Sequence, residues 1–223
     1  MADDVPGARP GPPGALPGAP GAPGLRERKR LAAMTRIQDR ALELFEERGF
    51  DGVTVEEIAA ASDVSPSSVY RWFGTKEELV LWDEFDPEID RHLGPALAEE
   101  VPLAGLRRVV VGVVEGLTAD REHQVRRRAA LMMSTPELEQ AASARTYEMA
   151  EHIGRAMAQR LGRPLEDLEV QVFSHAFTGG ILGMLHHWHG TGFAEPLDAV
   201  VRRVFDIFEE GLDVVRAGGS AAR

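Results

Sequence analysis

The fold of this chain is most constrained by a run of closely spaced helix starts and stops between residues 36 and 83. The run opens with apolar residues at the i, i+4, i+7 and i+8 positions of a helix, namely Ile37, Ala41, Leu44 and Phe45. Such a stripe opposite a charged face predicts an amphipathic helix of about three turns. Gly49 is placed to end this helix.

Two short helices are predicted next. Thr54 is placed as an N-cap with Glu57 three residues later, the arrangement called a capping box. This helix is expected to end near residue 61 or 62. Ser65 then caps a second helix whose first position holds Pro66, where the missing N–H has no cost. Because so few residues separate the two helices, they are expected to cross steeply, as in a helix-turn-helix.

The second of these helices carries the residues expected to read DNA. Val69 and Phe73 are its inward positions, and the outward positions hold Ser67, Ser68, Tyr70 and Arg71. A helix that reads the major groove presents polar and aromatic side chains in this way. The pattern therefore predicts sequence-specific binding of double-stranded DNA.

A fourth helix is predicted from Thr75 to Phe85. Thr75 is its N-cap, and Glu78 stands at the capping-box position. Lys76 places a cation in the first turn, where the helix macrodipole favours an anion. This placement indicates a phosphate as the partner of Lys76.

The segments LFEERGF and TVEEIAAASDVSPSSVYRWFGTKEEL resemble the signature of the TetR (tetracycline repressor) family of bacterial regulators. Every anchor of that signature matches, and two other positions depart from the usual pattern. Asp63 stands where the family usually has glycine in the turn, and aspartate tolerates a left-handed backbone better than most residues. Trp72 stands at the second aromatic position of the usual YxYF or YxHF sequence.

The resemblance implies a role in operator binding for each exposed residue of the motif. Thr54 and Lys76 are expected to contact phosphates, and Tyr70 and Trp72 to pack against the DNA backbone or a thymine methyl. The candidates for base edges are Ser67, Ser68 and Arg71. Ser65, at the start of the recognition helix, completes the set. The alternative, that some of these residues are simply solvated surface, stays open.

The formal net charge of −11 argues against a general affinity for nucleic acid. Positive charge is nevertheless concentrated just before the first predicted helix, at Arg26, Arg28, Lys29 and Arg30. This basic arm is expected either to contact a phosphate or a minor groove, or to be an ordinary solvated charge run. The acidic remainder weakens non-specific DNA binding without excluding specific binding.

The first 24 residues have Pro or Gly at nearly every second position and predict a disordered tail, and residues 218–223 a second short one. No apolar run approaches the ~20 residues needed to span a bilayer, and the start lacks the features of a signal peptide. The chain has no cysteine. These features predict a cytoplasmic protein that does not bind a membrane.

After residue 85, helix boundaries or kinks are expected at Asp86-Pro87, Gly94-Pro95 and Pro102. Five helical segments are then predicted, at about residues 103–117, 122–133, 136–162, 166–188 and 196–215. No strand-period alternation competes with them. The expected fold is all-α, with a helix-turn-helix domain and connecting helix over residues 25–85 and a helical ligand-binding and dimerisation domain over residues 86–217.

The last two predicted helices indicate a homodimer. One carries a long apolar stripe, formed by Leu197, Val201, Val204, Phe205, Phe208, Leu212 and Val215. The other has a side of small residues suited to close helix approach, formed by Ala176, Gly179, Gly180 and Gly183. The family resemblance implies a four-helix interface, which would present two recognition helices to successive major grooves about 34 to 36 Å apart. Burial of both stripes inside one subunit is the alternative.

Large apolar residues on facing helices predict a pocket for an apolar effector. They are Met132, Met133, Met149, Ile153, Met157, Phe173, Phe177, Ile181, Met184 and Trp188. A plain hydrophobic core is the alternative for each of them.

The segments LWDEFDP and RRRAALMMSTPEL resemble a subset of actinobacterial TetR-like regulators, of the mycofactocin-regulator type, whose C-terminal domain binds acyl-coenzyme A-like ligands. This resemblance implies that Arg126, Arg127 and Arg128 meet the phosphates of a coenzyme A. Three consecutive helical positions cannot share one face, so at least one of these arginines is expected on a solvated face.

The histidines offer a rival chemistry. His186 and His189 have the spacing of two ligands of one metal, but no third ligand stands at matching spacing, so no metal site is predicted. His175 is expected in the core or in a pocket wall. No nucleophile, base and orienting carboxylate come together, so neither an enzyme nor a cofactor is predicted.

The sequence as a whole predicts a homodimeric, ligand-responsive transcriptional regulator, in particular a repressor. Its partners are expected to be a pseudo-palindromic operator, a small apolar or acyl-coenzyme A-like effector, and a second copy of the chain. The alternative is an effector-independent helical repressor or architectural protein, which a bundle without a cavity would favour.

Overall fold

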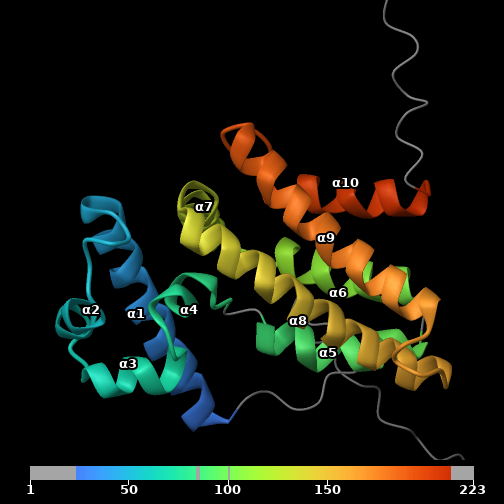
Figure 1. Cartoon of the computed structure of the whole chain (residues 1–223), viewed down its shortest axis with the longest axis horizontal. Helices are drawn as coiled ribbons and strands as arrows, with labels where there is room; N and C mark the ends of the chain where they lie inside the picture. Colours follow the sequence, from blue (N-terminus) through green and yellow to red (C-terminus); the bar gives the residue numbers. More distant parts are fainter. Residues whose placement is uncertain (1–23, 84–85, 100, 212–223) are drawn as a thin grey trace, which may run out of the picture.

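The computed structural model describes residues 24–83, 86–99 and 101–211, and these residues form ten α-helices and no strand. The predicted all-α fold is confirmed. Four helices make a small N-terminal domain, drawn in blue to teal in Figure 1: α1 (Leu25–Arg48), α2 (Val55–Ala61), α3 (Pro66–Phe73) and α4 (Lys76–Leu81). Six helices form the bundle beside it: α5 (Asp86–Glu99), α6 (Pro102–Glu115), α7 (Ala119–Ser134), α8 (Pro136–Leu161), α9 (Leu168–Gly190) and α10 (Leu197–Glu209).

The predicted caps define the short helices of the N-terminal domain. Thr54 and Glu57 form both hydrogen bonds of the capping box at the start of α2. Ser65 accepts from the backbone N–H of Ser68 with Pro66 in the first position of α3. Between α2 and α3, Asp63 has a φ of 55°, so the turn keeps the left-handed conformation that the sequence predicts.

The hydrophobic core of the N-terminal domain extends into the bundle. Ile37 and Phe45 of α1 pack with Ile58 of α2 and Val69 of α3, and each of these side chains is at most 1 % exposed. Leu138, near the start of α8, is fully buried in the same cluster. The N-terminal domain and the bundle therefore share apolar contacts.

Helix α1 begins more than two turns earlier than predicted. It starts at Leu25, so the basic cluster of residues 26–30 lies inside the helix and not before it. Gly24 is the N-cap and has no side chain to accept a hydrogen bond, so it marks the helix start less clearly than Ser, Thr, Asp or Asn would. Arg30 pairs with Glu27 one turn earlier, at 2.6 Å between Nη2 and Oε1.

Helix α4 is shorter than predicted and has only half of its capping box. It ends at Leu81, and Trp82 has an extended backbone. Phe85, the predicted end, lies outside the described residues. The Thr75 side chain accepts from the Glu78 N–H as expected, but the Glu78 carboxylate accepts from Arg145 of α8, 2.9 Å from Nη1.

Helix α5 was not predicted, because its two prolines were interpreted as helix boundaries or kinks. Pro95 lies inside the helix, although Asp86 does open it. His92, Leu93, Ala96 and Leu97 are buried at helical spacing, and this burial keeps the segment helical across the proline. Gly105 of α6 permits a close crossing, since a Cβ there would lie 2.9 Å from the Ala96 carbonyl oxygen.

The remaining helices follow their predicted positions. Figure 1 shows the long helix α8, in yellow, running beside α9, in orange, with α10 packed across the outer side of α9. Helix α10 ends at Glu209, so the last predicted members of its apolar stripe, Leu212 and Val215, fall outside the described residues. None of the helices in the described ranges is long and apolar enough to cross a membrane.

Candidate nucleic-acid interface and ligand cavity

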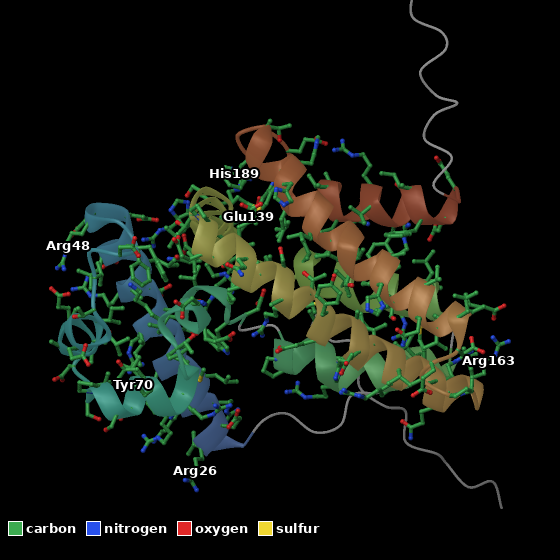
Figure 2. The ribbon with its side chains drawn as sticks, in the orientation of Figure 1. Arg26, Arg48, Tyr70, Glu139, Arg163 and His189 are labelled. Carbon is green, nitrogen blue, oxygen red and sulfur yellow. The ribbon has the colours of Figure 1, made fainter. Side chains whose placement is uncertain are left out.

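The outward face of α3 is exposed on the surface of the helix-turn-helix. Val69 and Phe73 are buried and hold α3 against the domain core, as predicted. The same orientation exposes Ser67, Tyr70 and Arg71, with 48 % of Tyr70 accessible. Figure 2 shows Tyr70 at the lower edge of the N-terminal domain, the edge at which Arg26 of α1 also lies. This face offers hydroxyl, phenol and guanidinium groups to a partner.

Hydrogen bonds among the serines preorganise the start of α3. The Ser65 hydroxyl lies 2.9 Å from the hydroxyls of Ser67 and Ser68 and caps the Ser68 N–H. Arg71 reaches back to the Ser68 hydroxyl at 3.4 Å, and its guanidinium carbon lies 5.5 Å from the centre of the Trp72 ring. Trp72 is half-buried against the domain core, so it offers less surface than Tyr70.

Thr54 lies at the start of α2 with its side chain committed to the capping box. Its hydroxyl donates to the Glu57 carboxylate at 2.9 Å, and its backbone N–H does so at 2.8 Å. These bonds and one from Arg48 lower the pKa of Glu57 to about 2. Thr54 itself remains exposed at the surface.

Contacts within the protein explain the position of Lys76. Its Nζ donates to the carbonyl oxygens of Phe50, at 2.9 Å, and Val53, at 3.3 Å. The same ammonium lies 4.2 Å from the centre of the Phe50 ring. Lys76 therefore ties the loop before α2 to the start of α4, and a cation in this first turn does not require a phosphate.

A cavity of about 240 Å³ lies among α4 to α10. Four of the predicted ligand residues line it: Met132, Met149, Ile181 and Met184. The other predicted ligand residues do not. Met157, Ile153, Phe177 and Trp188 are buried in the core, Phe173 packs against that core, and Met133 is half-buried elsewhere on α7. Trp188 satisfies its ring N–H with the Glu195 carbonyl at 2.8 Å.

Sequence reasoning missed most of the cavity wall. Val110, Val113, Val114 and Leu117 line it, although no ligand residue was predicted in the segment 103–117. The polar members of the wall are Asp83, Arg128, Arg145, Thr146 and Thr178. Periodicity locates the inward face of a helix, but it does not show which inward positions border a void.

The three consecutive arginines of α7 are each bound inside the protein. Arg126 pairs with Glu122 and donates to the Phe193 carbonyl. Arg127 forms a two-pronged pair with Glu46 of α1, with both N–O distances at 2.7 Å. Arg128 is buried and pairs with Asp83. The three side chains have different partners and do not converge on one site, as expected of consecutive helical positions, and phosphate binding by any of them stays a prediction.

The predicted dimerisation face is partly buried and partly exposed. Gly180 allows close packing of α9 against α10 within the subunit, because a Cβ there would lie 2.7 Å from the Phe208 ring of α10. Gly179 and Gly183 are exposed and have open space around them. A groove of about 390 Å³ lies between α9 and α10, lined in part by Gly183, Val204 and Phe208. An unfilled apolar groove beside open glycines suits a second helix pair.

Two histidines of α9 each lie near a single carboxylate. His186 lies 3.8 Å from the Glu139 carboxylate, and no group of three metal-ligating side chains occurs within the described ranges. His175 is exposed, with Nδ1 2.9 Å from the Gln171 carbonyl oxygen, so its predicted place in the core or a pocket wall is wrong.

Two family models match the chain. The model "Bacterial regulatory proteins, tetR family" matches residues 37–81, which hold the helix-turn-helix. The model "MftR C-terminal domain" matches residues 100–213, about half of the chain. Together the two matches cover both parts of the molecule described above.

Two named relatives and one solved structure extend this likeness. MftR of Mycobacterium tuberculosis, named as a regulator of mycofactocin biosynthesis, is 25 % identical over 83 % of this chain and 94 % of its own. The transcriptional regulator TcmR of Streptomyces glaucescens is 34 % identical over 65 % of this chain and 67 % of its own. The Thermus thermophilus repressor FadR, solved with lauroyl-CoA, is 21 % identical over 80 % of this chain and 94 % of its own, with a TM-score of 0.51.

Proposed function

Because the chain belongs to the TetR family of bacterial transcriptional regulators, which are not enzymes, we propose that it is a repressor controlled by a small molecule. In this proposal it binds a pseudo-palindromic operator as a homodimer, and an effector in the bundle releases it. The observation that carries the proposal is the exposed face of α3, where Ser67, Tyr70 and Arg71 stand on a helix fixed by the buried Val69 and Phe73.

The proposed DNA contacts divide into two groups. Ser67, Ser68 and Arg71 are assigned to base edges, since they provide donors and acceptors on the outward face of α3. The residues assigned to the sugar-phosphate backbone or a thymine methyl are Thr54, Ser65, Tyr70, Trp72 and Lys76. Two carbonyls already accept from Lys76, so it would offer a phosphate its third N–H.

The basic first turns of α1 are proposed to add phosphate contacts. Arg26, Arg28 and Lys29 are carried by a helix, so their spacing on the protein is set by the helix and not by a flexible arm. Arg30 contributes less, because it already pairs with Glu27. Such contacts would strengthen binding at low salt without carrying sequence information.

Homodimerisation through α9 and α10 is proposed from the exposed glycines and the groove between these helices. Two-fold symmetry would place two copies of α3 on one side of the dimer. Each copy would then read one half of the operator, with the half-sites about 34 to 36 Å apart.

The cavity supports control by an effector. An effector-independent repressor would be favoured by a filled bundle, whereas about 240 Å³ is open among α4 to α10. Its apolar wall suits an apolar ligand, and acyl-coenzyme A is a candidate because FadR binds lauroyl-CoA. In this conformation the cavity is below the ~300–1,000 Å³ of typical ligand sites, so a coenzyme A moiety would have to remain outside it.

The cytoplasm, where the chromosome lies, is the proposed location.

An electrophoretic shift assay tests the proposed function. The purified protein is titrated onto DNA from its own promoter and the adjacent divergent gene, at two salt concentrations, with and without a long-chain acyl-coenzyme A. We expect a specific complex that weakens at higher salt. Release by the acyl-coenzyme A would support that ligand class, and a complex indifferent to it would remove acyl-coenzyme A as the effector. No specific complex on any genomic fragment would contradict the repressor.

A further inference from the structure

One arginine connects the cavity with the end of α4. Arg128 of α7 lines the cavity, and only 10 % of its side chain is exposed. Its Nη2 donates to the Asp83 carboxylate at 2.9 Å, and its Nη1 donates to the Trp82 carbonyl. Both acceptors belong to the segment that directly follows α4. The same residue therefore borders the cavity and, through its guanidinium, contacts the segment that connects the bundle to the DNA-binding domain.

The backbone carbonyl groups at the end of α4 accept hydrogen bonds from side chains of both α1 and the bundle. Gln38 of α1 donates through Nε2 to the carbonyls of Leu79, at 2.9 Å, and Trp82, at 2.7 Å. Arg128 supplies a further donor to Trp82 from the side of the bundle. One turn earlier, Arg145 of α8 pairs with Glu78 at 2.9 Å and also lines the cavity. Helix α4 is thus held against the bundle through two arginines that a ligand can reach.

The ionisable residues that line the cavity, within the part of the chain that the structure describes, are Arg128, Arg145 and Asp83. Arg128 pairs with Asp83 in the wall itself, whereas the carboxylate partner of Arg145, Glu78, does not line the cavity. The two threonine hydroxyls of the wall have no proton left to donate to a ligand, since Thr146 donates to the Ala142 carbonyl and Thr178 to the Ser174 carbonyl. The remaining lining is apolar. A buried cation surrounded by apolar surface favours an anion with an apolar body.

We propose that the effector of this cavity carries an anionic head, such as a carboxylate, on a compact apolar body, and that Arg128 receives the head. The proposal rests on the proposed function, because it names the ligand class of the same cavity. The ligand anion competes with Asp83 and the Trp82 carbonyl for the N–H groups of Arg128. A ligand shifts an equilibrium only by its differential affinity for two states, and this competition supplies the difference. An uncharged ligand of equal size leaves the Arg128–Asp83 pair in place.

The test uses the full-length protein without DNA, so it does not depend on knowing the operator. Calorimetry compares the binding of decanoate with that of 1-decanol in the wild type and two variants. Arg128→Gln removes the proposed anion receptor. Arg127→Gln is the matched control, because Arg127 is the adjacent residue, pairs with Glu46 and does not line the cavity. Hydrogen exchange of the Trp82 amide, which donates to the Glu78 carbonyl, monitors the end of α4.

We expect the wild type and Arg127→Gln to bind decanoate about ten-fold or more tightly than 1-decanol. Arg128→Gln should lose this preference, and decanoate, but not 1-decanol, should accelerate exchange at Trp82 in the wild type. If Arg128→Gln is poorly folded, Arg128→Gln with Asp83→Asn replaces it, since this pair leaves no buried charge without a counterion. Equal affinity for the two probes, binding of neither, or an unchanged preference without Arg128 would overturn the proposal. Failure to bind DNA would contradict the proposed function alone.

Discussion

Hydrogen bonds to Glu57 make the start of α2 sensitive to acid. The Thr54 backbone N–H, Arg48 and the Thr54 hydroxyl all donate to its carboxylate, and they lower its pKa from 4.5 to about 2. A carboxyl group with a lowered pKa in the folded state stabilises that state above its unfolded pKa. The stabilisation is therefore complete above pH 4.5 and is lost as the pH falls towards 2.

We expect Glu57→Gln to be less stable than the wild type near neutral pH, with a difference that shrinks as the pH falls from 4.5 towards 2. The free energy of unfolding, measured by urea denaturation at several pH values, checks this. Glu148→Gln is the control, since Glu148 is exposed in the middle of α8 and caps no helix. A difference between Glu57→Gln and the wild type that stays constant with pH would contradict the assignment.

Gln38 is a second residue whose side-chain hydrogen bonds are expected to stabilise the fold. It is 5 % exposed and donates to the carbonyls of Leu79 and Trp82. Gln38→Met keeps the approximate shape and removes both donors, so we expect a loss of about 1–3 kcal/mol of stability. Gln140→Met, at an exposed position of α8, should change little. Thermal and urea denaturation of the two variants would show the difference, and equal stabilities would contradict it.

At the scale of single residues, sequence reasoning succeeded where one helix determines the environment. Tyr70 is exposed because Val69 and Phe73 are buried on the same short helix, and this follows from spacing alone. The prediction for Lys76 used only its position in the first turn of its own helix. Its partners are the carbonyls of Phe50 and Val53, more than twenty residues away in the sequence. Contacts of this range depend on how the elements pack, and local spacing does not contain them.

At the scale of elements, the capped starts of the short helices α2, α3 and α4 were predictable, whereas the start of α1 and the helix α5 were not. Thr54, Ser65 and Thr75 each accept a hydrogen bond from the first turn of the helix that follows. Helix α1 starts at an uncapped glycine, and α5 contains Pro95 in its interior. Both helices form because their apolar faces are buried by neighbouring helices, a tertiary effect that outweighs local signals.

The open glycines of α9 lead to a prediction about assembly. Gly183 lies at the groove between α9 and α10, and a Cβ there would meet no neighbouring side chain and no other helix within 4 Å. Gly183→Leu should therefore leave the subunit folded, because leucine is the better helix former, but it should fill the surface proposed for the partner. We expect its mass in solution, measured by light scattering, to shift from dimer towards monomer.

Ala144→Leu provides the control for this prediction. Ala144 is exposed on α8, away from the groove between α9 and α10, so the same added side chain should leave the dimer intact. A dimeric Gly183→Leu variant, or a monomeric wild type, would contradict the proposed interface.

At the scale of the whole molecule, charged contacts join the bundle to the DNA-binding domain. Arg127 pairs with Glu46 of α1, and Arg128 pairs with Asp83 after α4. Burial raises the pKa of the Asp39 carboxyl on α1, while the positive charges of Arg121, Arg127 and Arg128 oppose this increase. Helix α7 therefore contacts the DNA-binding domain and also lines the cavity. Helix α4, which contacts α3, also borders the cavity.

The division into a helix-turn-helix domain and a bundle was predictable from the chain, but the arrangement of the two parts was not. The division follows from helix caps and apolar spacing. The arrangement depends on ion pairs such as Arg127 with Glu46 and Arg145 with Glu78, whose members stand far apart in sequence. The cavity likewise exists because α4 to α10 leave space that their side chains do not fill.

The central claim, that α3 reads DNA, is tested most directly by the operator affinities of two tyrosine variants. The sequence contains only Tyr70, 48 % exposed on α3, and Tyr147, 68 % exposed on α8. Fluorescence anisotropy on a promoter fragment should show that Tyr70→Ala weakens specific binding by about ten-fold or more, equivalent to about 1.4 kcal/mol, with little change in salt dependence. Tyr147→Ala should bind as the wild type does. Equal affinities of the wild type and both variants would contradict the account.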